Sequence, residues 1–154
     1  MTEKIKKVAL ITGGGTGIGR SAAIALQKDD FHVIICGRRQ EQLDETISLG
    51  ATDKPKISAI IADVTNSDSV RSLFADIKNE HGRLDILFNN AGMGAPRVEL
   101  DELEEDAWRK CVDVNLTGSF LCAQAAFKMM KSQSPQGGRI INNGSISAHA
   151  PRPN

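Results

Sequence analysis

The chain has few aromatic residues, no excess of basic residues and no long apolar run, and these absences argue against several functions. Its 154 residues include no tyrosine and one tryptophan, and 19 basic residues are balanced by 19 acidic ones. The one small basic cluster is "EKIKK", which argues against nucleic-acid binding because a protein that follows a phosphate backbone carries a basic surface. Every apolar run is shorter than the roughly 18 residues of a membrane span, so no membrane partner is expected.

Cysteine and histidine are also scarce. The three cysteines are widely spaced and odd in number, which is typical of reduced thiols rather than of a disulfide framework. The three histidines lie far apart, and no Cys/His cluster has metal-ligand spacing. At the N-terminus "VALIT" runs directly into glycines, without the core of a signal peptide. These features predict a cytoplasmic protein that binds no metal.

Short apolar runs alternate with helical patterns along the whole chain. Continuous apolar runs are typical of strands covered on both faces, and their alternation with helices predicts parallel strands joined by right-handed crossovers. We therefore predict a single α/β domain over residues 1–154, with a doubly wound parallel sheet (Rossmann fold). The predicted strands are 7–12, 31–36, 56–63, 84–90 and 137–143, and the predicted helices are 20–29, 41–50, 65–82 and 103–131.

The glycine turn "TGGGTGIG" (12–19) after the first strand has two interpretations. In such sheets ligands bind at the carboxyl ends of the strands, where glycines let the backbone approach a phosphate. The first interpretation is the phosphate loop of a nucleotide triphosphatase, with Gly14 to Gly19 followed by Arg20 and with Asp63 on the magnesium side. That loop needs a lysine after its last glycine, and the planar fork of an arginine is no equivalent.

The second interpretation reads the same turn as T-G-x-x-x-G-x-G, and four more motifs follow it in order. They are "DV" at 63–64, "NNAG" at 89–92, "VNLTG" at 114–118 and "GGRIINNGSIS" at 137–147. With these five motifs the chain resembles the short-chain dehydrogenase/reductase family, from its first strand to its last residue.

The resemblance implies a role for each motif. Asn115 and Ser145 match the family's catalytic asparagine and serine, while the other motifs match its dinucleotide site. Each of these two also has a structural alternative: Ser145 could cap a turn, and Asn115 could be a polar position on a helix. The implied cofactor residues are Gly13, Thr16, Gly17, Ile18 and Gly19 for the pyrophosphate, Asp63 and Val64 for the adenine, and Asn90, Ala91 and Gly92 for the ribose–nicotinamide side.

The end of the second strand distinguishes the two nicotinamide cofactors. NAD-binding sites carry an acid there, which bonds the ribose 2′-hydroxyl and repels a 2′-phosphate. Here the strand ends "CGRR", with Gly37 in place of the acid and Arg38 and Arg39 after it. Arginine binds phosphate through charge-assisted hydrogen bonds, so the sequence favours NADP(H) over NAD(H), with Arg38 as the first choice. The alternative is a pair of solvated loop arginines.

The family's acid–base pair is absent from the 154 residues. The resemblance implies a Tyr-x-x-x-Lys just past Asn154, followed by the last strands of the family's sheet. A chain that ended at Asn154 would leave an apolar edge strand unpaired, which favours aggregation. We therefore expect these residues to belong to a longer enzyme and to be inactive alone. The alternative is a truncated dinucleotide-binding fragment or sensor without catalysis.

The resemblance, with the NADP(H) preference from the second strand, implies an NADP(H)-dependent oxidoreductase that interconverts a ketone or aldehyde with an alcohol by hydride transfer. Its expected partners are a small carbonyl or alcohol substrate and further copies of itself. The resemblance implies a homo-oligomer, either a dimer or a tetramer.

Overall fold

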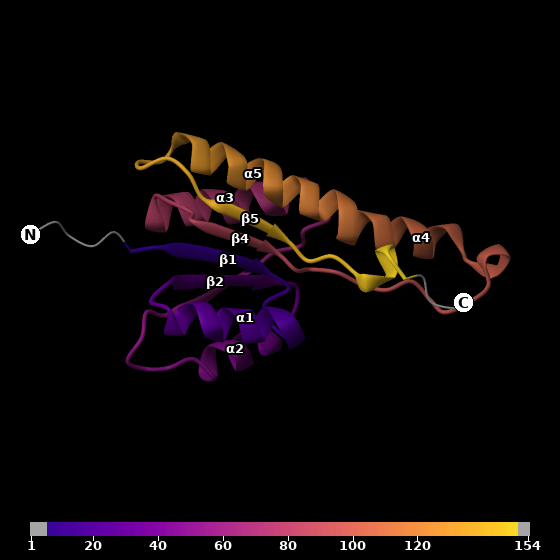
Figure 1. The fold of residues 1–154 in the computed structure, drawn as a ribbon, viewed down its shortest axis with the longest axis horizontal. Helices are drawn as coiled ribbons and strands as arrows, with labels where there is room; N and C mark the ends of the chain where they lie inside the picture. Colours follow the sequence, from indigo (N-terminus) through magenta and orange to yellow (C-terminus); the bar gives the residue numbers. More distant parts are fainter. Residues whose placement is uncertain (1–5, 151–154) are drawn as a thin grey trace, which may run out of the picture.

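A five-stranded parallel sheet forms the centre of the molecule (Figure 1). The computed structural model describes residues 6–150. The strands lie in the order β3-β2-β1-β4-β5, and every neighbouring pair is parallel. The predicted doubly wound sheet is confirmed, and the strands differ from their predicted ranges by at most two residues at either end. Their bounds are β1 (Val8–Thr12), β2 (His32–Gly37), β3 (Ile57–Ile61), β4 (Ile86–Asn89) and β5 (Arg139–Asn142).

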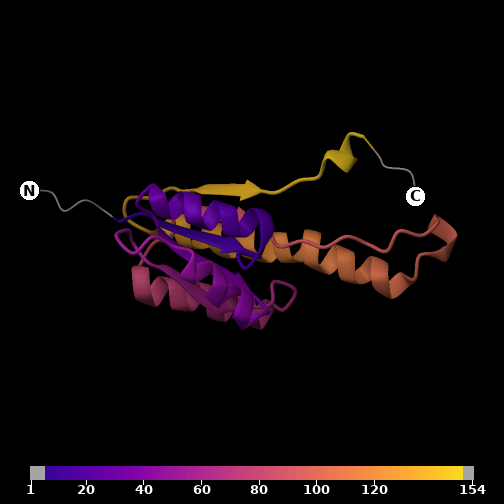
Figure 2. The same cartoon turned by 90° about the horizontal axis from the view of Figure 1, so that it is seen from below.

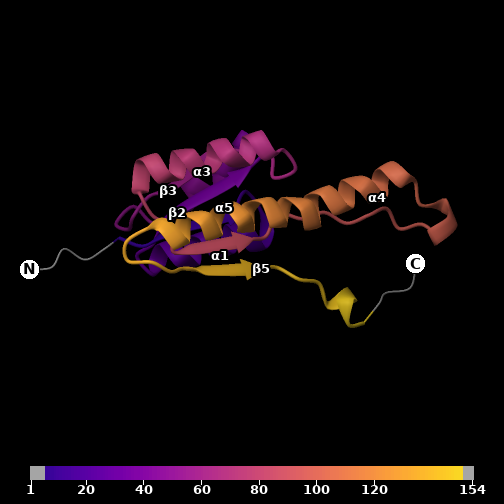
Figure 3. The ribbon, with the colours of Figure 1, turned by 90° about the horizontal axis from the view of Figure 1, so that it is seen from above.

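Helices cover both faces of the sheet (Figures 2 and 3). One core lies between the sheet and one pair of helices and contains Leu10 and Leu87, while the core on the other face contains Ile11 and Ile35. Successive side chains of a strand thus enter different cores, which explains why the apolar runs are continuous. No helix within residues 6–150 is long and apolar enough to cross a membrane. On one face lie α1 (Gly17–Lys28) and α2 (Gln40–Ser48), and on the other α3 (Ser67–His81) and α5 (Gly118–Ser132).

Capping residues in the sequence indicate the ends of α3 but not the start of α1. α3 follows its signals: the Asn66 side chain accepts hydrogen bonds from two backbone N–H groups of the first turn, and Gly82 ends the helix with a φ of 69°. α1, by contrast, starts at Gly17 and not at the predicted Arg20. Glycine is a poor helix former, so the sequence hides this first helical turn. As a result, α1 begins inside the glycine turn itself.

The predicted helix 103–131 is one long rod with a change of pitch in its middle. α4 (Glu105–Val112) passes into a π-helical turn, η2 (Asp113–Thr117), and then into α5. α4 projects past the carboxyl ends of the strands (Figure 3). Turns of this kind often mark functional positions. Two short 3-10 turns complete the fold, η1 (Leu100–Glu102) before α4 and η3 (Ile146–Ala148) after β5.

A largely buried ion pair joins three strands at the opposite, amino edge of the sheet. The Asp85 carboxylate accepts hydrogen bonds from the Val8 backbone N–H (2.8 Å) and from Arg83 Nε (3.0 Å) and Nη2 (2.7 Å). The Asp85 carbonyl oxygen accepts from the Arg139 backbone N–H at 2.8 Å. Burial raises the pKa of Asp85, but the hydrogen bonds from Arg83 and Val8 and the charge of Arg83 outweigh it, so this pKa lies below its ordinary value.

We expect Asp85→Asn to lower the free energy of unfolding at pH 7 by about 2 kcal/mol, because the three donors lose a charged acceptor. The pKa of Asp85 is depressed in the folded state, so its contribution is present above the ordinary aspartate pKa and is lost as the pH falls through the folded-state pKa. In urea denaturation, the gap between wild type and variant should stay constant down to about pH 5 and shrink below it.

Asp101→Asn, on the exposed turn η1, is the control for this variant. An equal loss of stability in Asp101→Asn, or a gap for Asp85→Asn that is the same at low and neutral pH, would contradict the assigned role.

Candidate active site

A cleft of about 530 Å³ lies at the carboxyl ends of the strands. The strand order reverses between β1 and β4, and open α/β sheets bind ligands at such a switch point. Four segments far apart in the sequence meet at this cleft, and most of the predicted cofactor residues are among those that line it. They are Gly13, Thr16, Gly17 and Ile18 after β1, Arg38 and Arg39 after β2, Asp63 and Val64 after β3, and Asn90, Ala91 and Gly92 after β4.

Glycines shape the turn between β1 and α1 in two different ways. Gly13 and Gly17 have φ angles of 66° and 52°, in the left-handed region that favours glycine. Gly17 lines the cleft, and no atom lies within 4 Å of the place where its Cβ would be. Gly19, predicted as a cofactor residue, is buried and does not line the cleft. A Cβ on Gly19 would lie 2.3 Å from the Gly13 carbonyl oxygen, so this glycine serves the packing of α1 against the turn.

The start of α1 offers uncapped N–H groups beside the cleft. Thr16 is the N-cap residue and has an extended backbone, but its side chain makes no capping hydrogen bond. The first turn of α1 contains no acidic residue that would neutralise the positive end of the helix. These features fit a phosphate group, which binds to the N–H groups and the dipole of a helix N-terminus.

Two arginines follow β2 at the next edge of the cleft. Arg38 and Arg39 line it together with Gly37, and Arg39 is the N-cap residue of α2. A Cβ at Gly37 would meet only Leu43, at 3.6 Å, so packing does not exclude a larger side chain there. None of the ion pairs among the described residues includes Arg38 or Arg39. This edge therefore presents positive charge to an anionic ligand group.

Asp63 lies at the following edge with its carboxylate held in place. Its Oδ1 accepts hydrogen bonds from the Thr65 backbone N–H (3.0 Å) and the Thr65 hydroxyl (2.8 Å). Burial raises the pKa of Asp63, but the hydrogen bonds from Thr65 and the charge of Arg38 outweigh it, and this pKa lies below its ordinary value. Among the described residues nothing donates to Oδ2, so this oxygen is left to accept from a ligand such as an amine.

Two residues outside the predicted set hold the segment after β4 in place beside the cleft. Thr12, at the end of β1, is buried, and its Oγ accepts from the backbone N–H groups of Asn90 (3.0 Å) and Ala91 (2.9 Å). Asn143, after β5, lines the cleft, and its Nδ2 donates to Asn90 Oδ1 at 3.1 Å. The Asn90 side chain also donates to the carbonyl of Thr12 at 3.0 Å. The motif frame already contains Thr12, whereas no sequence signal distinguishes Asn143 from the neighbouring Asn142.

Asn115 connects the π turn to the loop that follows "NNAG". Its Oδ1 accepts from the Met93 backbone N–H (2.9 Å), and its Nδ2 donates to the Met93 carbonyl oxygen (2.8 Å). A contact from Nδ2 to Cys111 Sγ follows at 3.2 Å. Asn115 does not line the cleft, but Met93 does. An asparagine is unfavourable inside a helix, and the doubly bonded loop accounts for its presence here.

Ser145 caps the short turn η3 after β5. Its Oγ accepts from the Ser147 backbone N–H at 3.1 Å, and the residue is exposed. Ser145 does not line the cleft, and no hydrogen bond joins it to Asn115 within residues 6–150. Ser145 Oγ therefore acts as the acceptor of a turn cap, and none of the hydrogen bonds among residues 6–150 uses its hydroxyl proton.

Arg20 does not take the place of a triphosphatase lysine. It is absent from the cleft lining, and its guanidinium bonds to Glu45 on α2 and to the carbonyl of Gly15. The described residues also contain no group of three or more His, Cys, Asp or Glu side chains that could hold a metal ion. The first interpretation of the glycine turn thus lacks the basic side chain after the last glycine that would reach a bound phosphate.

Known proteins match this chain over nearly all of its length. The sequence profile of the short chain dehydrogenase family matches residues 7–154. A 3beta-hydroxysteroid dehydrogenase of Mediterraneibacter gnavus is 35% identical over 142 residues, which are 92% of this chain and 50% of that protein. The chain thus spans about half the length of this curated relative.

Two solved structures with bound dinucleotides share the fold. The structure of NAD+-bound xylitol dehydrogenase has a TM-score of 0.90 at 25% identity, over 99% of this chain and 58% of that one. A metagenomic short-chain oxidoreductase in complex with NADP has a TM-score of 0.87 at 26% identity, over 97% of this chain and 66% of that one. With its ordered motifs around one cleft and the profile match from the first strand onward, the chain belongs to the short-chain dehydrogenase family.

Proposed function

We propose that this chain is the cofactor-binding part of an NADP(H)-dependent oxidoreductase that interconverts a carbonyl and an alcohol. The oxidoreductase class of the reaction follows from membership of the short-chain dehydrogenase family. The observation that carries the choice of cofactor is the end of β2, where Gly37 stands in place of an acid and Arg38 lines the cleft. When bound, the nicotinamide supplies or accepts a hydride.

Similar folds bind NAD+ in one relative and NADP in another, so the fold does not decide between the cofactors. The local charge at the end of β2 supports NADP(H). A carboxylate at position 37 would repel a 2′-phosphate, and glycine removes it. Arg38 also lies near enough to Asp63 to contribute to its lowered pKa. In this proposal the Arg38 guanidinium binds the 2′-phosphate through charge-assisted hydrogen bonds, Asp63 accepts from the adenine amine, and the start of α1 holds the pyrophosphate.

Ser145 and Asn115 are the catalytic residues that we propose within this chain. The Ser145 oxygen accepts from the Ser147 N–H, so its own proton can be donated to a substrate oxygen. Asn115 holds Met93, and through it the loop at one wall of the cleft. The resemblance implies a tyrosine as the proton donor, and these 154 residues contain none. In this proposal a tyrosine outside them donates the proton.

The proposed enzyme is a cytoplasmic homo-oligomer, a dimer or a tetramer. The long rod carries large apolar side chains that are more than half exposed, which supports burial of this surface in an assembly. All three cysteines are free, which supports a reducing compartment. The exposed apolar side chains on the rod are Trp108 (52%), Leu116 (67%), Phe120 (57%) and Phe127 (64%).

Arg38→Gln should weaken NADPH binding about 10- to 100-fold and NADH binding less than about twofold, because only NADPH carries the 2′-phosphate. Isothermal titration calorimetry with both cofactors measures the two changes. Arg109→Gln removes an exposed arginine that pairs with Glu105 on α4, and it serves as the control. A similar loss for both cofactors, or no loss for NADPH, would show that Arg38 does not bind the 2′-phosphate.

Ser145→Ala should lower kcat for NADPH-dependent carbonyl reduction about 10²- to 10³-fold, because the substrate oxygen loses a donor. The dissociation constant of NADPH should change by less than about twofold, because Ser145 does not line the cleft. Both are measured on the enzyme that carries this chain, with Ser147→Ala as the control, since only the backbone N–H of Ser147 contacts Ser145. Turnover of Ser145→Ala at the wild-type rate would rule out a catalytic role.

A further inference from the structure

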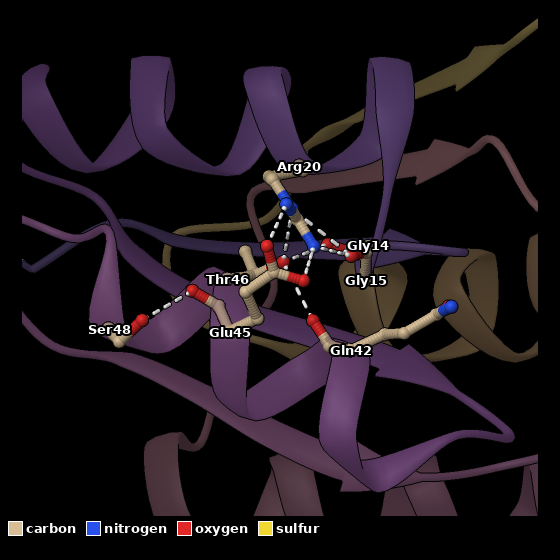
Figure 4. A network of polar contacts seen from close by, with 7 residues as sticks. All are labelled: Gly14, Gly15, Arg20, Gln42, Glu45, Thr46 and Ser48. Carbon is tan, nitrogen blue, oxygen red and sulfur yellow. Dashed lines mark hydrogen bonds and ion pairs between the residues drawn. The ribbon is translucent and has the colours of Figure 1, made fainter.

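Arg20 joins three parts of the fold that border the cofactor cleft (Figure 4). Its Nη1 and Nη2 donate to the two carboxylate oxygens of Glu45, at 2.9 and 2.7 Å. Its Nη2 and Nε also reach the Gly15 carbonyl oxygen, at 2.6 and 3.1 Å. One guanidinium on α1 therefore binds both α2 and the glycine turn, with the paired geometry of a strong charge-assisted contact.

Thr46 extends this contact to the neighbouring residue of the turn. Its side chain is fully buried, and its Oγ accepts from Arg20 Nε at 3.1 Å. The same hydroxyl lies 3.1 Å from the carbonyl oxygens of Gly14 and Gln42, which share its one proton. Two successive carbonyl groups of the turn, those of Gly14 and Gly15, are thus held toward α2.

The held carbonyls also determine the direction of two N–H groups. In a planar trans peptide the carbonyl of one residue and the N–H of the next point in opposite directions. Holding the Gly14 and Gly15 carbonyls toward α2 therefore turns the N–H groups of Gly15 and Thr16 away from α2. Both Gly15 and Thr16 line the cleft. The contacts with Arg20 and Thr46 thus orient the backbone on the phosphate side of the turn.

α2 carries the other phosphate-binding half of the cleft. It begins directly after Arg39, its N-cap residue, and Gln42 from its first turns lines the cleft. A Cβ on Gly15 would lie 3.0 Å from the Cβ of Gln42, so the turn and α2 are in direct contact. The separation between the glycine turn and the arginine pair after β2 therefore depends on the contacts of Arg20 and Thr46, together with the hydrogen bond from the Gly14 N–H to the Cys36 carbonyl oxygen at 3.2 Å.

We propose that Arg20, with Glu45 and Thr46, forms a clamp that fixes the separation between the two phosphate-binding halves of the cleft. Arg20 is a positioning residue in this account and does not bind the cofactor. The inference rests on the proposed function, because NADP(H) carries a phosphate at each half and NAD(H) does not. A ligand that bridges both halves gains from their fixed separation, whereas a ligand with one phosphate needs only one half.

Adenosine nucleotides with one or two phosphates separate these cases. In Arg20→Met, the affinity for 2′,5′-ADP should fall about tenfold and the affinity for 5′-AMP about threefold or less, because 5′-AMP loses only its contacts with the loosened turn. The affinity for 2′-AMP should change by less than about twofold. Thr46→Val should show the same pattern, and Thr46→Ser, which keeps the hydroxyl, should bind all three ligands like the wild type. Titrations followed by NMR chemical shifts give the three dissociation constants for each folded variant.

Arg109→Met is the control, because it removes an exposed arginine from an ion pair with glutamate on α4, away from the cleft. A loss of stability without a change in 2′,5′-ADP affinity in the folded variants would make the clamp purely structural and overturn the inference. An equal loss for 2′,5′-ADP and 5′-AMP would overturn it too, since only the turn would then be affected. If Arg20→Met does not fold, Arg20→Lys and Thr46→Val provide the same comparison. A wild type that binds 2′,5′-ADP no more tightly than 5′-AMP would refute the proposed NADP(H) site itself.

Discussion

The geometry of the cleft depends on how closely α1 approaches the end of β1. At Gly19 a single Cβ would come within 2.3 Å of the Gly13 carbonyl oxygen, so only a glycine lets the helix start inside the turn. Because it starts there, its uncapped N–H groups lie beside the switch point of the sheet. Asn90 uses the same close approach to bond the carbonyls of Thr12 and Gly13, which brings the end of β4 against the turn.

The two edges of the sheet use their polar groups in opposite ways. At the amino edge, Asp85 and Arg83 satisfy each other and tie strand ends together. At the carboxyl edge, donors and charges are left for a ligand: the start of α1 is uncapped, and Arg38 takes part in none of the ion pairs found in the described part of the chain. The amino edge thus uses its charges within the fold, while the carboxyl edge keeps some of them for binding, as expected for a sheet whose ligand lies at the carboxyl ends of its strands.

The sequence predicts the parts of this molecule that follow from local pattern. Continuous apolar runs predict the five strands, and ordered motifs predict the segments that meet at the cleft, because parallel strands bring their carboxyl ends to one edge. The start of α1 at Gly17 is not predictable in this way, since glycines conceal a helical turn. Nor is the orientation of Arg20, which depends on Glu45 and Thr46 of another helix. The position of Asn143 at the cleft is not predictable for the same reason, because its hydrogen bond to Asn90 joins residues 53 positions apart in the sequence.

The most direct test of the central claim is the affinity of the wild-type protein for NADPH and for NADH, measured by calorimetry under identical salt and pH. The arrangement of Gly37 and Arg38 at the cleft predicts that NADPH binds at least about tenfold more tightly, because a 2′-phosphate bonded to an arginine contributes a charge-assisted hydrogen bond that a hydroxyl does not. Equal affinities, or tighter binding of NADH, would contradict the assignment of this edge to the 2′-phosphate.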